Sequence, residues 1–154
     1  MAGPTPDFWQ DRFEKGQALW DRGGVSPQLR TWLDTGSLAP STICVPGCGS
    51  GWEVAELARR GFDVTGVDHT PAAIERTRAL LQRQELVARV EQADVLTWYP
   101  EQPFDAIYEQ TCLCALHPDH WMPTPSNCTY GSGLRVRSGR CSCRPRPRAR
   151  PKAA

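Results

Sequence analysis

The sequence has no apolar run near the roughly 20 residues that a membrane-spanning helix needs, so we expect no such segment. Its first six residues also lack the basic start and apolar stretch of a secretory signal. The seven cysteines are an odd number, which suits free thiols better than a disulfide framework. We therefore expect a cytoplasmic protein, and 154 residues allow one compact domain.

Acidic residues are missing from the last part of the chain. All 17 lie between Asp7 and Asp119, and up to Trp121 they face ten basic residues, a net charge of −7. Residues 122–154 contain seven arginines, one lysine and no acid. They also have few large apolar side chains, so burial cannot offset the entropy of ordering them. These patterns predict an ordered domain over residues 1–121 and a disordered, Arg- and Pro-rich tail over residues 122–154.

The composition of the tail is typical of GC-rich coding sequence translated out of frame. With suitable codons for residues 122–131, dropping two bases gives Ala-Tyr-Ala-Glu-Gln-Leu-His-Leu-Trp, a pattern suited to a helix. We therefore predict a frameshift near Trp121. A basic tail that binds nucleic acid is the alternative, and whether the tail survives resequencing of the gene separates the two.

The ordered part alternates between strand and helix patterns. A proline at the first helical position follows both Ser26 and Thr70, and Gly36 and Gly61 end helical patterns. The expected helices are residues 27–33, 52–60 and 71–81, and the expected strands are residues 43–45, 62–67, 89–91 and 104–108. This alternation predicts an α/β, Rossmann-like fold with a parallel, doubly wound sheet.

A glycine turn follows the first strand. Gly47, Gly49 and Gly51 permit close approach of the backbone to a ligand, and Asp68 ends the second strand 17 positions later. An acid at about this offset holds the ribose of a nucleoside cofactor in such folds. The combination of turn, helix, strand and acid predicts a nucleoside-binding site, although the turn alone could be purely structural.

Two cofactors, a nicotinamide dinucleotide and S-adenosylmethionine, suit this arrangement. The turn departs from the G-x-G-x-x-G pattern that binds pyrophosphate. The sulfonium cation of S-adenosylmethionine favours aromatic faces, and Trp9, Phe13 and Trp20 are available, unless they form a core cluster. Asp94 and Val95 could meet the adenine, or Asp94 could simply cap a helix. The pattern favours S-adenosylmethionine, and an NAD-binding protein is the alternative.

The order of six motifs resembles the thiopurine S-methyltransferase superfamily, and in particular its halide and thiol methyltransferase branch. The motifs together reach across most of residues 8–118. They are the segments Phe8–Phe13, Trp20–Gly23, Val45–Gly51, Gly66–Asp68, Ala93–Val95 and Phe104–Pro118.

This resemblance implies a class I methyltransferase sheet of which strands 1–4 are present, and a set of residues around S-adenosylmethionine. The aromatic-rich start departs from the family at Phe13, where a tryptophan is common. The implied cofactor-binding residues are Trp9, Phe13 and Trp20 over the cofactor, Gly47 with Cys48 and Gly49 beside it at the methionine part, Asp68 at the ribose, Asp94 and Val95 at the adenine, and Gln110 after the fourth strand.

The activity that the resemblance implies is methyl transfer to a small soft nucleophile, such as a thiol, a thiopurine-like ring or a halide. Catalysis would come from proximity and alignment. We assign no catalytic residue, because Tyr108 suits a packed strand and Glu109 a solvated surface. The expected partner is a small-molecule methyl acceptor, with no nucleic acid and no membrane, and a full-length member is expected to be a monomer.

The sequence raises two further expectations about the chain as written. If its strands pair in the order 3-2-1-4, the fourth strand becomes an exposed edge, and segments that bind the acceptor have no recognisable counterpart. We therefore expect weak cofactor binding without turnover, and an inactive S-adenosylmethionine-binding fragment is an alternative function.

A zinc site is a competing interpretation of the segment after the fourth strand. Cys112, Cys114, His117 and His120 are ligand types that zinc prefers, but Cys-x-Cys is closer than the usual spacing. We therefore predict no metal site, and we expect Cys44 and Cys48 to be small apolar fillers.

Overall fold

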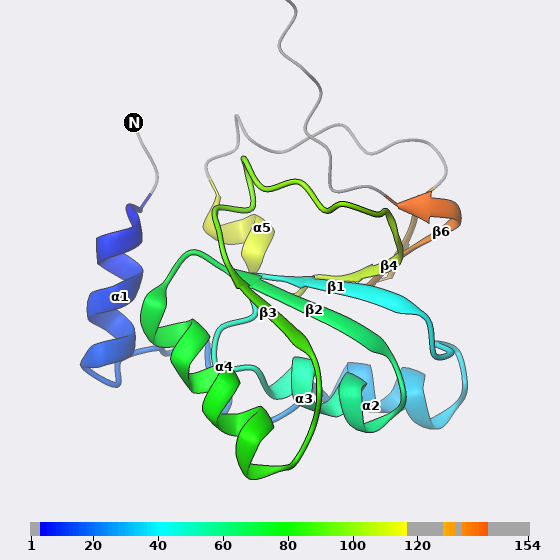
Figure 1. Cartoon of the computed structure of the whole chain (residues 1–154), viewed down its shortest axis with the longest axis horizontal. Coiled ribbons are helices and arrows are strands. Elements are labelled where there is room, and N and C mark those ends of the chain that lie inside the picture. Colours follow the sequence, from blue (N-terminus) through cyan, green and yellow to red (C-terminus); the bar gives the residue numbers. More distant parts are fainter. Residues whose placement is uncertain (1–3, 117–127, 132–133, 142–154) are drawn as a thin grey trace, which may run out of the picture.

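A six-stranded sheet in the order β3-β2-β1-β4-β6-β5 forms the centre of the computed structural model, which describes residues 4–116, 128–131 and 134–141 (Figure 1). The strands are β1 Thr42–Pro46, β2 Asp63–Asp68, β3 Arg89–Gln92, β4 Phe104–Tyr108, β5 Cys128–Gly131 and β6 Leu134–Cys141. The helices are α1 Pro6–Glu14, α2 Pro27–Asp34, α3 Trp52–Arg59, α4 Pro71–Arg83 and α5 Cys112–Ala115.

The four strands β3, β2, β1 and β4 are parallel, in the order 3-2-1-4 that the family resemblance implies. In their register Ile43 lies opposite Val64 on one side and Ala106 on the other. Asp68 pairs with Gln92 at the carboxyl end of β2. Parallel pairing brings the carboxyl ends of β1 to β4 to one edge of the sheet, where ligands bind in open α/β folds.

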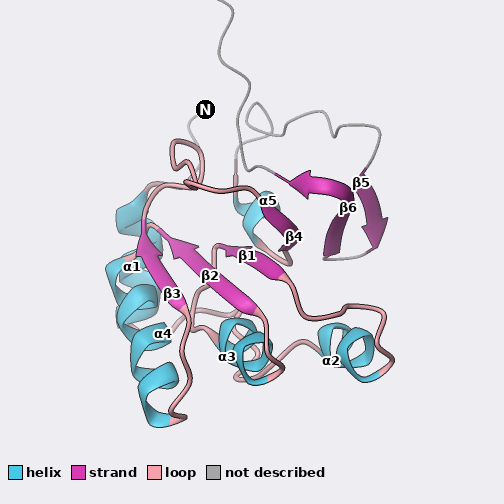
Figure 2. Ribbon diagram, turned by 45° about the vertical axis from the view of Figure 1, so that its right-hand side comes forward, coloured by secondary structure: helices cyan, strands magenta, loops and turns pink. Residues whose placement is uncertain are grey.

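Helices α2, α3 and α4 lie on one face of these strands (Figure 2). Each of α1, α2 and α4 begins with proline, whose fixed φ suits the first helical turn. The predicted helices are confirmed to within two residues at each end. Two short helices, α1 and α5, were not predicted, because α1 alternates aromatic and charged residues without a clear apolar face and α5 has only four residues.

Each face of the sheet has its own apolar cluster, because successive strand residues point to opposite sides. The larger cluster lies under the helices and includes Leu29, Ile43 and Leu57, which are fully buried. The smaller one contains Cys44 and Val67 and is covered by the segment after β3, where Trp98 stacks on Phe104 at 6.2 Å between ring centroids. The sheet is thus covered on both faces, although the described helices α2 to α4 share one face.

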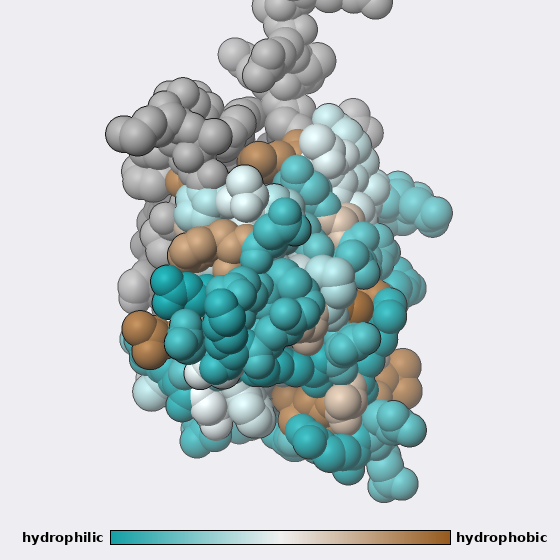
Figure 3. Space-filling view, turned by 90° about the vertical axis from the view of Figure 1, so that its left-hand side faces the viewer, coloured by the Kyte–Doolittle hydropathy of each residue, from teal (hydrophilic) through white to brown (hydrophobic). Residues whose placement is uncertain are grey.

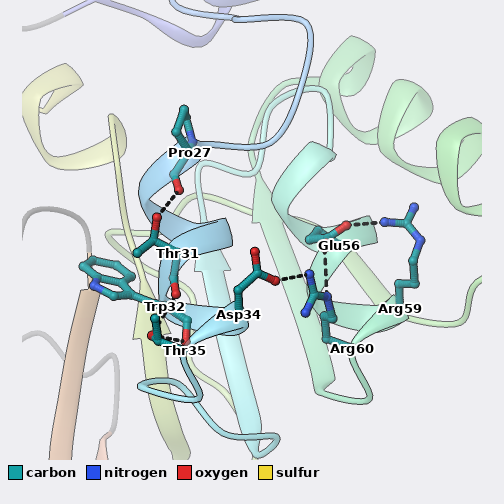
Figure 4. A network of polar contacts seen from close by, with 8 residues as sticks. All are labelled: Pro27, Thr31, Trp32, Asp34, Thr35, Glu56, Arg59 and Arg60. Atoms are coloured by element: carbon teal, nitrogen blue, oxygen red, sulfur yellow. Dashed lines mark hydrogen bonds and ion pairs between the residues drawn. The ribbon is translucent and has the colours of Figure 1, made fainter.

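A polar network joins α2 to α3 on the helical side (Figure 4). Arg60 contacts Asp34 at 2.7 Å and Glu56 at 3.0 Å, and Glu56 also pairs with Arg59. The buried carboxylate of Glu56 is therefore balanced by two guanidinium groups, as buried charges require.

The surface over α1 and α4 is largely hydrophilic, with only scattered apolar side chains (Figure 3). Among the described residues the large exposed ones are Phe8, Leu19, Val87 and Tyr99. No helix in the described part of the chain is long and apolar enough to cross a membrane.

Two strands of the structure lie within the segment for which the sequence predicts a disordered tail. Strands β5 and β6 lie within residues 122–154, and β6 pairs antiparallel with β4, with Ile107 opposite Arg135. The prediction that β4 is an open edge is therefore wrong. Main-chain groups of an open edge pair with any available extended segment. The alternation of Leu134 and Val136 with arginines suits a strand, a signal that the basic composition obscured.

Several predictions fall on residues that the structure does not describe. Residues 117–127, 132–133 and 142–154 lie outside the described residues, and they include the predicted frameshift point at Trp121 and two of the zinc candidates, His117 and His120. Within the described residues no group of three or more metal-ligating side chains comes together.

Candidate functional site

The glycine turn joins β1 to α3 at the carboxyl edge of the sheet. Gly47, Gly49 and Gly51 all have positive φ, at 62°, 57° and 84°. A Cβ atom at Gly47 would lie 2.9 Å from Cβ of Cys112, and one at Gly51 would lie 2.6 Å from Oγ1 of Thr77. At Gly49 the nearest atom would be Phe13 Cζ at 3.7 Å. Packing therefore requires glycine at positions 47 and 51, while a Cβ at position 49 would fit at ordinary contact distance.

Asp68 links the turn to the next helix. Its carboxylate accepts one hydrogen bond from the Gly49 amide at 3.1 Å and another from the Thr70 amide at 2.9 Å. The side chain is buried to 8% exposure at the end of β2. The structure thus brings the predicted acid directly to the predicted turn.

The three early aromatic residues meet beside this turn. The ring of Trp20 lies edge-on to Trp9 at 5.0 Å and to Phe13 at 5.7 Å between centroids. Arg76 lies over the Phe13 ring at 5.3 Å and donates a hydrogen bond to the Phe13 carbonyl at 2.5 Å. Phe13 is buried, whereas both tryptophans are half-buried. Phe13 therefore acts as a core residue that fixes α1 on α4, and the tryptophans keep surface for a ligand.

Asp94 caps a turn, because no helix begins directly after it in the structure. Its carboxylate accepts a hydrogen bond from the Leu96 amide at 2.9 Å, and its carbonyl accepts one from the Trp98 amide at 2.8 Å. The side chain is exposed, and the Ala93 amide beside it donates to the Asp68 carbonyl at 2.9 Å. Val95 is half-buried against the smaller apolar cluster. The Ala93 hydrogen bond thus brings Asp94 and Val95 near the end of β2.

A pocket opens on the other side of the turn, between the segment after α1 and the ends of β1 and β4. Five of the predicted site residues line it, while Trp9, Phe13, Asp68, Asp94 and Val95 do not. Its walls are Trp20, Asp21, Arg22, Gly24, Val45, Pro46, Gly47, Cys48, Gly49, Ser50, Trp52, Glu53, Tyr108, Gln110 and Thr111.

Gln110 and Cys48 differ in what they offer to this pocket. The Gln110 amide oxygen accepts a hydrogen bond from the Tyr108 hydroxyl at 3.2 Å. Burial, aided by the negative charge of Asp68, raises the pKa of the Cys48 thiol to about 12. The thiol is therefore protonated at neutral pH, which agrees with the expectation that Cys48 fills space rather than reacts.

Asp21 is a residue of this site that sequence reasoning missed. Its carboxylate accepts hydrogen bonds from the Ser50 hydroxyl, from Trp52 Nε1 at 2.9 Å and from the Gly23 amide at 2.8 Å. Burial alone would raise the pKa of Asp21, but these donors outweigh it and hold that pKa below its usual range. The side chain clamps the segment after α1 to the glycine turn and α3. The only sequence signal was its position next to Trp20 in the motif Trp20–Gly23.

Glu53 is a second missed residue. It lies in the first turn of α3, lines the pocket and accepts a hydrogen bond from the Ser26 amide at 3.1 Å. Burial raises its pKa above the usual value, and burial likewise raises the pKa of Tyr108 nearby. A helical carboxylate of this kind carries no sequence signal that separates it from a solvated one.

Comparison with known proteins identifies the family. Residues 4–123 match the family model of thiopurine S-methyltransferase. The chain belongs to the thiopurine S-methyltransferase family. Members of this family are S-adenosylmethionine-dependent methyltransferases, so the resemblance seen in the sequence is confirmed.

Two relatives show how much of a family member is present. A probable thiol methyltransferase 2 from Arabidopsis thaliana is 33% identical over 121 residues, which are 77% of this chain and 53% of that protein. A thiopurine S-methyltransferase from Pseudomonas fluorescens is 31% identical over 147 residues, which cover 83% of this chain and 62% of that protein. The chain spans about half to three fifths of the length of these curated relatives.

Solved structures support the fold. A structure described as converting a disulfide bond into a thioacetal group during echinomycin biosynthesis has a TM-score of 0.66 and 26% identity, over 75% of this chain and 52% of that one. The Burkholderia thailandensis 1,6-didemethyltoxoflavin-N1-methyltransferase, with bound S-adenosylhomocysteine, has a TM-score of 0.60 and 23% identity, over 74% and 50% of the two chains. The α/β, Rossmann-like methyltransferase fold is thereby confirmed.

Proposed function

We propose that this chain binds S-adenosylmethionine and carries the cofactor half of a methyltransferase that acts on a small soft nucleophile. The observation that carries the proposal is the hydrogen bond between Asp68 and the Gly49 amide, which sets a ribose-binding acid against an open glycine turn. Membership of the thiopurine S-methyltransferase family supports the same cofactor.

The described residues fit the parts of this cofactor. Asp68 would hold the ribose hydroxyls, with Asp94 and Val95 beside the adenine. Gly49 lines the pocket and has no side chain, which would let the cofactor sulfur approach the turn closely. The half-buried rings of Trp9 and Trp20 would stabilise a sulfonium cation, because aromatic faces attract positive charge.

S-adenosylmethionine would supply an electrophilic methyl group, and the protein would hold the methyl acceptor in position next to it. The pocket wall formed by Trp20 and Gln110 would hold the acceptor near the cofactor sulfur, since proximity and alignment are the main requirements for displacement. Relatives are named thiol, thiocyanate and thiopurine methyltransferases, which supports a thiol, thiopurine-like or halide-like acceptor for this chain. No residue is assigned as a catalytic base.

Partners and location follow from the same proposal. We expect a small-molecule acceptor, no nucleic-acid or membrane partner, a cytoplasmic protein and a monomer at full length. If the protein is not retained on immobilised nucleic acid at any salt concentration, the result would agree with this expectation. Salt-dependent binding to duplex DNA would contradict it.

The proposal is tested by calorimetric titration of the purified chain with S-adenosylhomocysteine and, separately, with NAD. We expect binding of the first ligand only. Asp68→Asn should weaken S-adenosylhomocysteine by about 1.5–3 kcal/mol, the size of charge-assisted hydrogen bonds. Methyl transfer to a small thiol, followed by mass spectrometry, then tests the acceptor. Binding of NAD but not of S-adenosylhomocysteine would overturn the assignment.

A further inference from the structure

The pocket beside the glycine turn carries charged groups of both signs. Its charged walls are Asp21, Arg22 and Glu53. Asp21 is already occupied by donors from Gly23, Ser50 and Trp52, so it acts as a structural clamp. Glu53 and Arg22 are therefore the charged side chains that remain for a ligand.

Glu53, which is half-buried, differs from Glu56, the buried carboxylate of the same helix. Glu56 is paired with both Arg59 and Arg60 (Figure 4). Glu53, three residues earlier, accepts a hydrogen bond from the Ser26 amide but makes no ion pair with any described residue. A half-buried carboxylate that lines a pocket and has no ion pair within the described residues is a suitable partner for a cationic group of a ligand.

The position of Glu53 in the site indicates which cationic group of a ligand would lie beside it. Asp68 lies on one side of the turn, and the pocket extends from Gly49 away from it, towards α3 and the end of β4. A cofactor whose ribose is held at Asp68 would pass Gly49 and present its opposite end to Glu53. In S-adenosylmethionine that end is an amino acid, with one ammonium group and one carboxylate.

We propose that Glu53 binds the α-ammonium group of the methionine part of the cofactor and that Arg22 binds its carboxylate. The assignment rests on the proposed function. Arg22 lines the pocket and its positive charge acts on both Glu53 and Tyr108, so the two opposite charges lie near one another. The ammonium group would supply the ion pair that Glu53 lacks, and a ligand without an amino-acid end would bind less tightly.

A binding cycle tests this assignment without relying on activity. Calorimetry would measure S-adenosylhomocysteine and its analogue without the α-amino group, each with the wild-type chain and with Glu53→Gln. We expect the wild type to bind the amino-containing ligand 10- to 100-fold more tightly than the analogue. In Glu53→Gln this preference should fall to under threefold. The cycle isolates the contact between the Glu53 carboxylate and the α-amino group. Arg22→Gln should weaken S-adenosylhomocysteine about tenfold and 5′-methylthioadenosine, which has no amino-acid end, less than twofold.

The matched control is Glu75→Gln, which removes the same charge from an exposed position on α4 and should leave every affinity unchanged. An undiminished preference for the amino group in Glu53→Gln would overturn the assignment. So would a variant that binds neither ligand while Arg22→Gln weakens S-adenosylhomocysteine and 5′-methylthioadenosine equally. A wild-type chain that binds none of these ligands would instead overturn the proposed function.

Discussion

At the scale of single residues, the three glycines of the turn differ in how tightly their surroundings are packed. Gly51 accommodates Thr77 of α4, Gly47 accommodates Cys112 of α5, and a Cβ at Gly49 would make only ordinary contact with Phe13. The sequence shows three equivalent glycines, and only the packing separates them. This distinction has measurable consequences for stability and for binding.

Gly51→Ala should destabilise the chain by about 3 kcal/mol or more, because the new Cβ would overlap Thr77 and the backbone has φ of 84°. Gly49→Ala should cost only about 1–2 kcal/mol for its positive φ, and it should weaken S-adenosylhomocysteine binding. Urea unfolding and calorimetry would measure the two effects. Equal losses of stability in both variants would contradict this division.

Glu53→Gln should increase the free energy of unfolding of the ligand-free chain at pH 7 by about 0.5–2 kcal/mol, the range of single stabilising substitutions. Burial raises the pKa of Glu53, so the native state binds more protons than the unfolded state between the ordinary and the raised value. The penalty of Glu53 thus grows as the pH rises through that window and disappears below it.

Urea unfolding at several pH values would follow this difference. It should be largest at neutral pH and vanish below the ordinary glutamate pKa. Glu75→Gln, at an exposed position, should show no such dependence. A Glu53→Gln variant that is less stable than the wild type at pH 7 would show that the carboxylate stabilises the ligand-free fold.

At the scale of elements, the site depends on how α1 and the segment after it are fastened. Arg76 fixes α1 to α4 through Phe13, and the Gln10 side chain accepts a hydrogen bond from the Ala72 amide at 3.0 Å. Asp21 then fastens the next segment to the glycine turn. The aromatic cluster is therefore positioned by contacts to elements distant in the sequence.

Asp21→Ala should lower stability by about 1.5–3 kcal/mol at pH 7, because it leaves the Trp52 Nε1 and Ser50 donors without their acceptor. The pKa of Asp21 is lowered in the fold, so its contribution is present above the ordinary value of 3.8 and is lost as the pH falls through the folded value. The difference from the wild type should accordingly shrink in acid.

Thermal melting of both proteins between pH 3 and pH 7 checks this. The matched control is Asp11→Ala, whose exposed ion pair with Lys15 should contribute less than about 1 kcal/mol. A gap between Asp21→Ala and the wild type that widens as the pH falls would contradict the clamp.

At the scale of the whole molecule, the antiparallel pairing of β6 covers the edge that β4 would otherwise expose. A chain shortened to residues 1–121 should lose this pairing and self-associate more than the 154-residue chain, since open strand edges template association. Sedimentation velocity at matched concentrations would compare the two. If both chains sediment as monomers, the edge of β4 does not need β6 to prevent association.

Two expectations about the whole chain stay predictions. Sequencing the gene across the Trp121 codon would test the frameshift, and an early stop codon in the shifted frame would end it. Weak cofactor binding without turnover is the expected behaviour of the 154-residue chain. Sustained methyl transfer to a small thiol by a monomeric preparation would contradict it.

The sequence by itself determined the alternation of strands and helices, the parallel sheet and the pairing of the glycine turn with Asp68, whereas the strand order came from the family resemblance. These features depend on local periodicity, on turn residues and on the handedness of β-α-β connections, all of which act over short stretches of chain. Recognition of the six motifs added the family, which the family model confirmed.

Only the tertiary structure decided which groups those elements bring together. The clamp of Asp21 on Trp52 spans 31 positions, and the hydrogen bond from the Ser26 amide to Glu53 spans 27. β6 pairs with β4 at the edge that the four parallel strands leave open. Each of these is a contact between distant segments, and neither composition nor periodicity records how distant side chains and strand edges meet.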